Sequence, residues 1–152
     1  MHSIVIADTS FLIAIQKLDL FNQIHALYKE VYVTQKIADE FQLALPLWIK
    51  VQQPLNTQLQ ITLSLILDPG EASAIALAYD FKEPLLIMDN LKARKVAGRL
   101  GFTITGTLGV LFKLKQEAHI ISLEEKITQL IAIGFRISPK IINEILEKAG
   151  EK

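Results

Sequence analysis

The sequence of 152 residues contains no cysteine. Its absence excludes a disulfide framework, a thiolate zinc site and a cysteine nucleophile, and it fits a reducing compartment. An excess of charge of either sign is also lacking, since 16 Lys and Arg side chains balance 16 Asp and Glu side chains. A neutral chain does not coat nucleic acid through a general basic field. A hydrophobic content of 51% excludes a disordered chain.

Long hydrophobic runs are missing as well. A membrane-spanning helix needs about 18 consecutive apolar residues, whereas the apolar stretches 4–7, 11–15, 61–67 and 85–88 are short and separated by polar residues. A secretory signal begins with basic residues, but no Lys or Arg precedes Lys17, and Asp8 interrupts the first apolar region. We therefore expect a soluble, cytoplasmic protein that does not bind membranes.

Short strands that alternate with amphipathic helices make up most of the chain. Residues 4–7, 31–33, 85–88 and 102–105 have the apolar or β-branched composition of strands, and 48–51 is a further extended segment. Such alternation predicts an α/β fold, with three layers and a central parallel sheet between helices. The length predicts a single domain over residues 1–152.

Helices are expected between and after these strands. Thr34 is suited to cap one that continues through Ala44, and Asn56 or Thr57 to open one that reaches residue 67. The other helical stretches are 9–27 in two pieces, 72–79, 91–100, 107–116, 123–132 and 139–149. The helices after about residue 122 pack either on the domain or on a partner.

Two acidic residues directly follow predicted strands. Asp8 comes after residues 4–7, and Asp89 comes after residues 85–88. Ligands bind at the carboxyl ends of strands in open α/β sheets, so both carboxylates are expected at one functional edge. Each could instead be only the N-cap of the helix that follows it.

Two further acids could join them. Glu40 lies beside the apolar face that Ile37 and Phe41 form on their predicted helix, where it could reach a cleft or remain a surface residue. Glu71 belongs to the sequence Asp68-Pro69-Gly70-Glu71, a capping pattern that explains it without chemistry. In the functional interpretation, Glu71 turns toward the strand edge.

Carboxylates that converge without cations repel one another, and a hard divalent cation relieves that repulsion. Oxygen ligands favour Mg²⁺ or Mn²⁺, which can activate water for attack on a phosphodiester. Close to Asp89 in sequence, Lys92, Lys95 and Arg99 share one helix face, with Arg94 turned away from it. That basic face is either a solvated surface or a site for RNA phosphates.

Together these segments resemble the PIN-domain family along nearly the whole chain. The matching segments, in order, are IVIADTS at 4–10, EF at 40–41, LDPGEA at 67–72 with AIALA at 74–78, and MDN at 88–90 with ARKVA at 93–97. The segment GFTITGTLG at 101–109 resembles a branch of small prokaryotic proteins akin to VapC toxins.

The resemblance implies a Mg²⁺- or Mn²⁺-dependent ribonuclease, often a homodimer and often the toxin of a toxin–antitoxin pair. The implied catalytic and metal-site residues are Asp8, Glu40, Glu71 and Asp89, with support from Thr9, Ser10 and Asn90. Related sequences often have a second acid where this chain has Asn90. The alternative is therefore a weakly active or inactive PIN-fold module that binds or regulates.

The C-terminal helices are rich in apolar residues and are a second candidate for contact with a partner. The residues concerned are Ile127, Leu130, Ile131, Ile141, Ile142, Ile145 and Leu146. They could form a homodimer or contact an antitoxin protein, or they could simply complete the core. The expected partners are thus an RNA substrate, a second copy of the chain and an antitoxin.

Overall fold

A computed structural model describes residues 4–152. It contains one five-stranded sheet in the order β3-β2-β1-β4-β5, in which every neighbouring pair is parallel. The strands are β1 (Ile4–Ala7), β2 (Glu30–Val33), β3 (Ile49–Val51), β4 (Leu85–Ile87) and β5 (Thr103–Thr105). This confirms the predicted α/β fold with a central parallel sheet between helices.

The strand order reverses between β1 and β4. The chain moves outward from β1 through β2 to β3, then crosses back to β4 on the other side of β1. Ala7 pairs with Ile87 at the carboxyl ends of the two strands, and Asp8 N donates to Ile87 O at 3.1 Å. In such sheets the crevice at this reversal is the usual ligand site, which places Asp8 at its centre.

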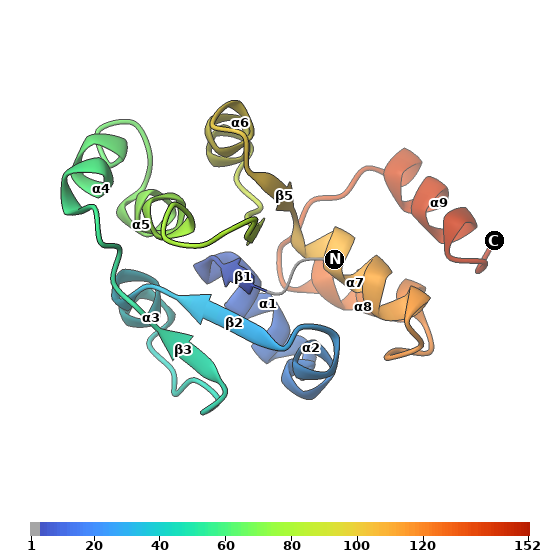
Figure 1. Cartoon of the computed structure of the whole chain (residues 1–152). Coiled ribbons are helices and arrows are strands. Elements are labelled where there is room, and N and C mark those ends of the chain that lie inside the picture. Colours follow the sequence, from blue (N-terminus) through green and yellow to red (C-terminus); the bar gives the residue numbers. More distant parts are fainter. Residues whose placement is uncertain (1–3) are drawn as a thin grey trace.

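Helices cover both faces of the sheet (Figure 1). α5 packs against β1 and β4 and also contacts α4 and α6, whereas α1 contacts α8 and α2 contacts α7. The helices are α1 (Thr9–Leu18), α2 (Phe21–Leu27), α3 (Gln35–Phe41), α4 (Thr57–Leu63), α5 (Pro69–Ala78), α6 (Leu91–Arg99), α7 (Thr107–Gln116), α8 (Leu123–Ala132) and α9 (Pro139–Lys148).

Two helices end earlier than the sequence predicts. α3 stops at Phe41 because Gln42 adopts a left-handed conformation with φ 62°, so Ala44 lies beyond the helix and is exposed. Pro46 disfavours helical conformation in the residue before it, which also opposes continuation. α4 ends at Leu63 and is followed by turns as far as residue 66. The prediction that these helices reach Ala44 and residue 67 was wrong.

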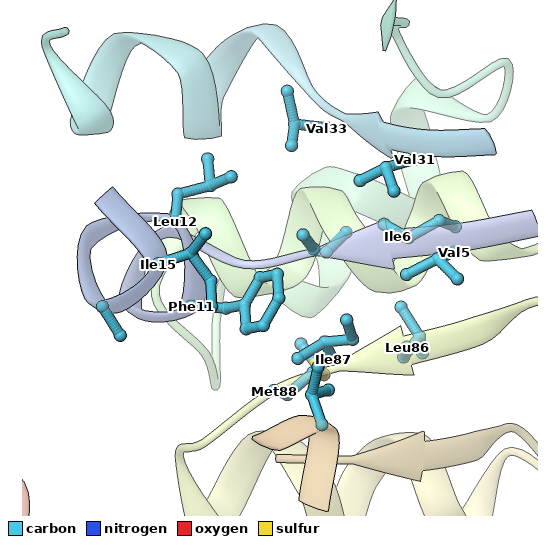
Figure 2. Packing of buried hydrophobic residues seen from close by; sticks show 14 of the residues in the cluster. Val5, Ile6, Phe11, Leu12, Ile15, Val31, Val33, Leu86, Ile87 and Met88 are labelled. Carbon is cyan, nitrogen blue, oxygen red and sulfur yellow. The ribbon is translucent and has the colours of Figure 1, made fainter. Parts of the chain in front are cut away.

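The core anchors the start of α1 at the functional edge. Phe11, Leu12 and Ile15 are fully buried, and Figure 2 shows Phe11 beside Ile87 and Met88. Burying a side chain of this size stabilises the fold by roughly 1.5–3 kcal/mol. The first turn of α1 therefore has little freedom to move, and Asp8, which precedes it, has a defined position.

The C-terminal helices pack onto the rest of the fold. α8 contacts α7 and α1, and α9 contacts α8. The Glu151 carboxylate accepts hydrogen bonds from the backbone N–H groups of Leu123 and Glu124, at 2.6 and 3.0 Å, and forms an ion pair with Lys115 at 3.1 Å. Between residues 4 and 152, no helix is both long and apolar enough to span a membrane.

Candidate active site

Asp8 is the most deeply buried acid at the strand edge, with 5% of its surface exposed. Its Oδ1 accepts a hydrogen bond from Phe11 N at 2.8 Å and so caps α1, which is one of the two roles considered from the sequence. Its Oδ2 accepts from Asp89 N at 3.2 Å. Burial raises the pKa of Asp8 to about 7, and the charges of Asp89 and Glu71 add to the increase while the two backbone hydrogen bonds oppose it.

A cavity of about 140 Å³ opens beside Asp8. Among residues 4–152, its lining contains four carboxylates and no basic side chain: the residues are Asp8, Thr9, Ser10, Glu40, Asp68, Glu71 and Asn90. The structure thus brings together Asp8, Glu40 and Glu71, from β1, α3 and α5, as the sequence suggested. Thr9, Ser10 and Asn90, expected in support, also lie at the cavity.

Glu40 is held by a neighbour in α1 and faces a glycine in α5. Thr9 Oγ1 donates a hydrogen bond to Glu40 Oε1 at 2.6 Å. A methyl group added at Gly70 would collide with the Glu40 carboxylate, so the close approach requires glycine. Asp39, the neighbouring acid, instead accepts a hydrogen bond from Gln35 at 2.8 Å on the exposed side of α3.

Buried hydroxyl groups join the two helices that carry Glu40 and Glu71. Thr34, which caps α3, lies 2.7 Å from Ser73 of α5 between their Oγ atoms, and both residues are fully buried. Ser73 in turn donates to Gly70 O at 2.6 Å. This contact fixes the first turn of α5 against the first turn of α3.

Glu71 has both of the roles considered from the sequence. Its carboxylate accepts a hydrogen bond from Asp68 N at 3.3 Å, which is half of a capping box, and it also lines the cavity. Burial raises the pKa of Glu71, the negative charges of Asp68 and Glu40 add to the increase, and the Asp68 N–H group opposes it. Capping and participation in a site therefore do not exclude each other.

Asp89 is not among the residues that line the cavity. Its carboxylate accepts hydrogen bonds from Thr107 N at 2.8 Å and Thr107 Oγ1 at 2.6 Å. Gly106, the N-cap of α7, has no side chain that could accept a hydrogen bond from the first turn of the helix. Asp89, 18 residues earlier in the sequence, accepts the hydrogen bond from the Thr107 N–H group instead. Asn90 lines the cavity instead and also caps α6 by accepting from Ala93 N at 3.0 Å.

Two participants were missed from the sequence alone. Asp68 was interpreted only as a helix cap, although its proximity to Glu71 was a signal that both could face one cavity. Thr107 gave no local signal, because its contact with Asp89 depends on the packing of β5 and α7. Lys92, Lys95 and Arg99 are exposed along α6, whereas Arg94 is half-buried.

The donor set of the cavity suits a hard divalent cation, because carboxylate, amide and hydroxyl oxygens are its preferred ligands. Burial is the main cause of the raised pKa of Asp8, and the negative charges of Asp89 and Glu71 add to it. Over residues 4–152, no three His, Asp or Glu side chains are gathered around one point in a way that could hold a metal ion.

Comparison with known proteins agrees with this geometry. A family model described as a PIN domain matches residues 4–151, which is almost the full length of the chain. No curated protein gives a significant match. The family model spans every strand of the sheet and every residue that lines the acidic cavity. This chain therefore belongs to the PIN-domain family.

Proposed function

We propose that this protein, a member of a family whose domains are generally nucleases, is a ribonuclease that depends on Mg²⁺ or Mn²⁺. The observation that carries the proposal is the cavity at the strand-order reversal, which is lined by four carboxylates and, within residues 4–152, by no basic side chain. Neutral hydrogen-bond donors hold these acids in place but do not neutralise them, so a divalent cation is the partner that their charge favours.

Asp8, Glu40, Asp68 and Glu71 would hold the metal, with the amide oxygen of Asn90 and the hydroxyl of Ser10 beside them. When bound, a metal of this kind lowers the pKa of a water molecule and stabilises negative charge on a phosphodiester. Asp89 supports the site from outside, since its backbone N–H group donates to Asp8.

The exposed basic face of α6 would position the RNA backbone. Lys92, Lys95 and Arg99 lie on the helix that begins beside Asn90, so a strand that enters the cavity passes close to α6. Electrostatic contacts of this kind make RNA binding dependent on salt. They also explain how a chain with no net charge can bind a polyanion locally.

The test is cleavage of single-stranded RNA with Mn²⁺ or Mg²⁺, with and without a chelator. We expect cleavage by the wild type, loss with the chelator, and a decrease of at least about 100-fold in Asp8→Asn and Glu40→Gln. Asp39→Asn is the matched control, because it removes a neighbouring carboxylate outside the cavity. Equal activity of Asp8→Asn and wild type, or no cleavage of varied RNAs by either, would contradict the proposal.

A second candidate is a PIN-fold module that binds or regulates with little catalysis. The observation that favours it is the neutral Asn90 at the cavity, together with carboxylates that are not gathered around one point in the described chain. Calorimetric titration with Mn²⁺ distinguishes the candidates. Binding that Asp8→Asn abolishes supports the nuclease, whereas no binding by the folded wild type at millimolar Mn²⁺ supports the module.

We also propose that the protein is a VapC-like toxin that forms a homodimer and is inhibited by an antitoxin protein. The resemblance of GFTITGTLG at 101–109 supports this role. Ile131 and Ile141 of the C-terminal helices are 45% and 48% exposed and offer apolar surface for such contacts. Growth arrest on expression, relieved by a protein encoded in a neighbouring gene, tests the toxin role. A monomer in light scattering would contradict the dimer.

A further inference from the structure

Arg94 is the basic residue of α6 that reaches the edge of the sheet. It lies one helical turn after Asn90, and residues at this spacing share a helix face. Helical side chains lean toward the N-terminus of their helix, and Arg94 Nη1 accordingly lies 3.5 Å from Met88 O at the end of β4. Arg94 is half-buried, whereas Lys92 and Lys95 are exposed.

The guanidinium group has few partners in the protein. Its one hydrogen bond within residues 4–152 is the long contact with Met88 O. Within residues 4–152, no carboxylate forms an ion pair with the Arg94 guanidinium group. The nearby Asp89 carboxylate is already bound by Thr107 through two hydrogen bonds. Most of the five N–H donors of the Arg94 guanidinium group therefore have no acceptor among residues 4–152 and are able to bind a ligand.

Glycine at position 106 makes room for this arrangement. A methyl group at Gly106 would lie 2.7 Å from Arg94 Nη1 and 2.9 Å from Asp89 Oδ1. Both contacts are shorter than real Cβ contacts, so an alanine would push the ends of these two side chains away. Gly106 therefore leaves space at the start of α7 for the ends of the Arg94 and Asp89 side chains, which lie on either side of it without forming an ion pair.

We propose that Arg94 binds a phosphate group of the RNA strand that occupies the acidic cavity. The proposal rests on the proposed ribonuclease function and adds a specific contact to it. A guanidinium group matches the geometry of a phosphate with two parallel N–H···O bonds, which a lysine cannot form. Arg94 does not line the cavity itself, so the phosphate it binds neighbours the one at the acidic residues.

The experiment is fluorescence anisotropy with a labelled single-stranded RNA in EDTA, which keeps the RNA intact. The variants are Arg94→Gln, Arg94→Lys, Gly106→Ala and the control Lys29→Gln. Lys29 is exposed just before β2, at the amino ends of the strands and therefore on the side of the sheet opposite to the cavity. Its substitution removes the same charge. Circular dichroism establishes that each variant is folded.

We expect Arg94→Gln to weaken binding about tenfold and to lower the salt slope by about one. Arg94→Lys keeps the charge but loses the paired bonds, so it recovers only part of the affinity. Gly106→Ala leaves the net charge unchanged and displaces the guanidinium group, so it should weaken binding severalfold. Lys29→Gln should bind within twofold of the wild type.

The outcomes separate this inference from the function on which it rests. If the folded wild type binds no RNA in EDTA, the role of Arg94 is refuted, whereas the ribonuclease proposal fails only if the wild type also cleaves no RNA with Mn²⁺ or Mg²⁺. If the wild type binds and Arg94→Gln binds equally well, only the role of Arg94 is refuted. If Arg94→Gln weakens binding but Gly106→Ala does not, the charge matters and its assigned position is wrong.

Discussion

Asp8→Asn should change how the stability of the protein depends on pH. In the folded state, burial raises the pKa of Asp8 from 3.8 to about 7. Between these values the folded protein holds a proton that the unfolded chain has lost, so stability falls as pH rises through this interval. The full cost is present above pH 7 and absent below about pH 4. Asparagine does not titrate and avoids this cost.

The two pKa values determine the size of the effect. From pH 5 to pH 8, ionisation of Asp8 should lower the free energy of unfolding of the wild type by about 2–3 kcal/mol. Asparagine can cap α1 equally well but can accept only one of the two backbone hydrogen bonds, which costs about 1–3 kcal/mol at every pH. Because this loss is the same at both pH values, it does not affect the change with pH in the stability difference between Asp8→Asn and wild type.

Urea unfolding followed by circular dichroism, at pH 5 and pH 8 in EDTA, measures the effect. The difference in stability between Asp8→Asn and wild type should shift by about 2–3 kcal/mol in favour of Asp8→Asn at the higher pH. Asp39→Asn, an exposed acid with no such burial, provides the control. A difference that stays constant within about 0.5 kcal/mol would refute the reasoning that burial controls the ionisation of Asp8.

Substitutions at three further positions test other parts of the site. Thr107→Val should destabilise the protein by about 1–3 kcal/mol in thermal unfolding, because it removes one of the hydrogen bonds to the Asp89 carboxylate. Thr107→Ser keeps the hydroxyl and should be nearly neutral. If both variants lower the stability equally, the Thr107 hydroxyl does not contribute to it. Gly70→Ala should displace the Glu40 carboxylate and weaken Mn²⁺ binding in calorimetry, with the helix retained in circular dichroism. Asn90→Asp should strengthen Mn²⁺ binding about tenfold, since it adds a carboxylate to the cavity, and unchanged affinity would show that position 90 does not contact the metal.

Local sequence signals were sufficient for most of the fold. Residues 4–7 form a strand whose last three residues are buried, and Asp8 caps the next helix. Both were predictable because β-branched composition favours a strand, and an N-cap residue favours a helix, within a few residues of itself. Ser122 and Ser138 likewise cap the helices predicted after them. The early end of α3 was missed because the left-handed conformation of Gln42 has no strong signal in the sequence.

The sequence by itself determined that acidic residues follow buried strands of a parallel sheet, and hence that they meet at one edge. Only the tertiary structure decided which of them face the cavity. Asp89 turns away because the start of α7, 18 residues later, needs an acceptor that Gly106 cannot provide. Asn90 and Asp68 line the cavity, and the Arg94 side chain contacts Met88 O at the end of β4. Side-chain direction at a strand end depends on long-range packing, which neighbouring residues in the sequence do not specify.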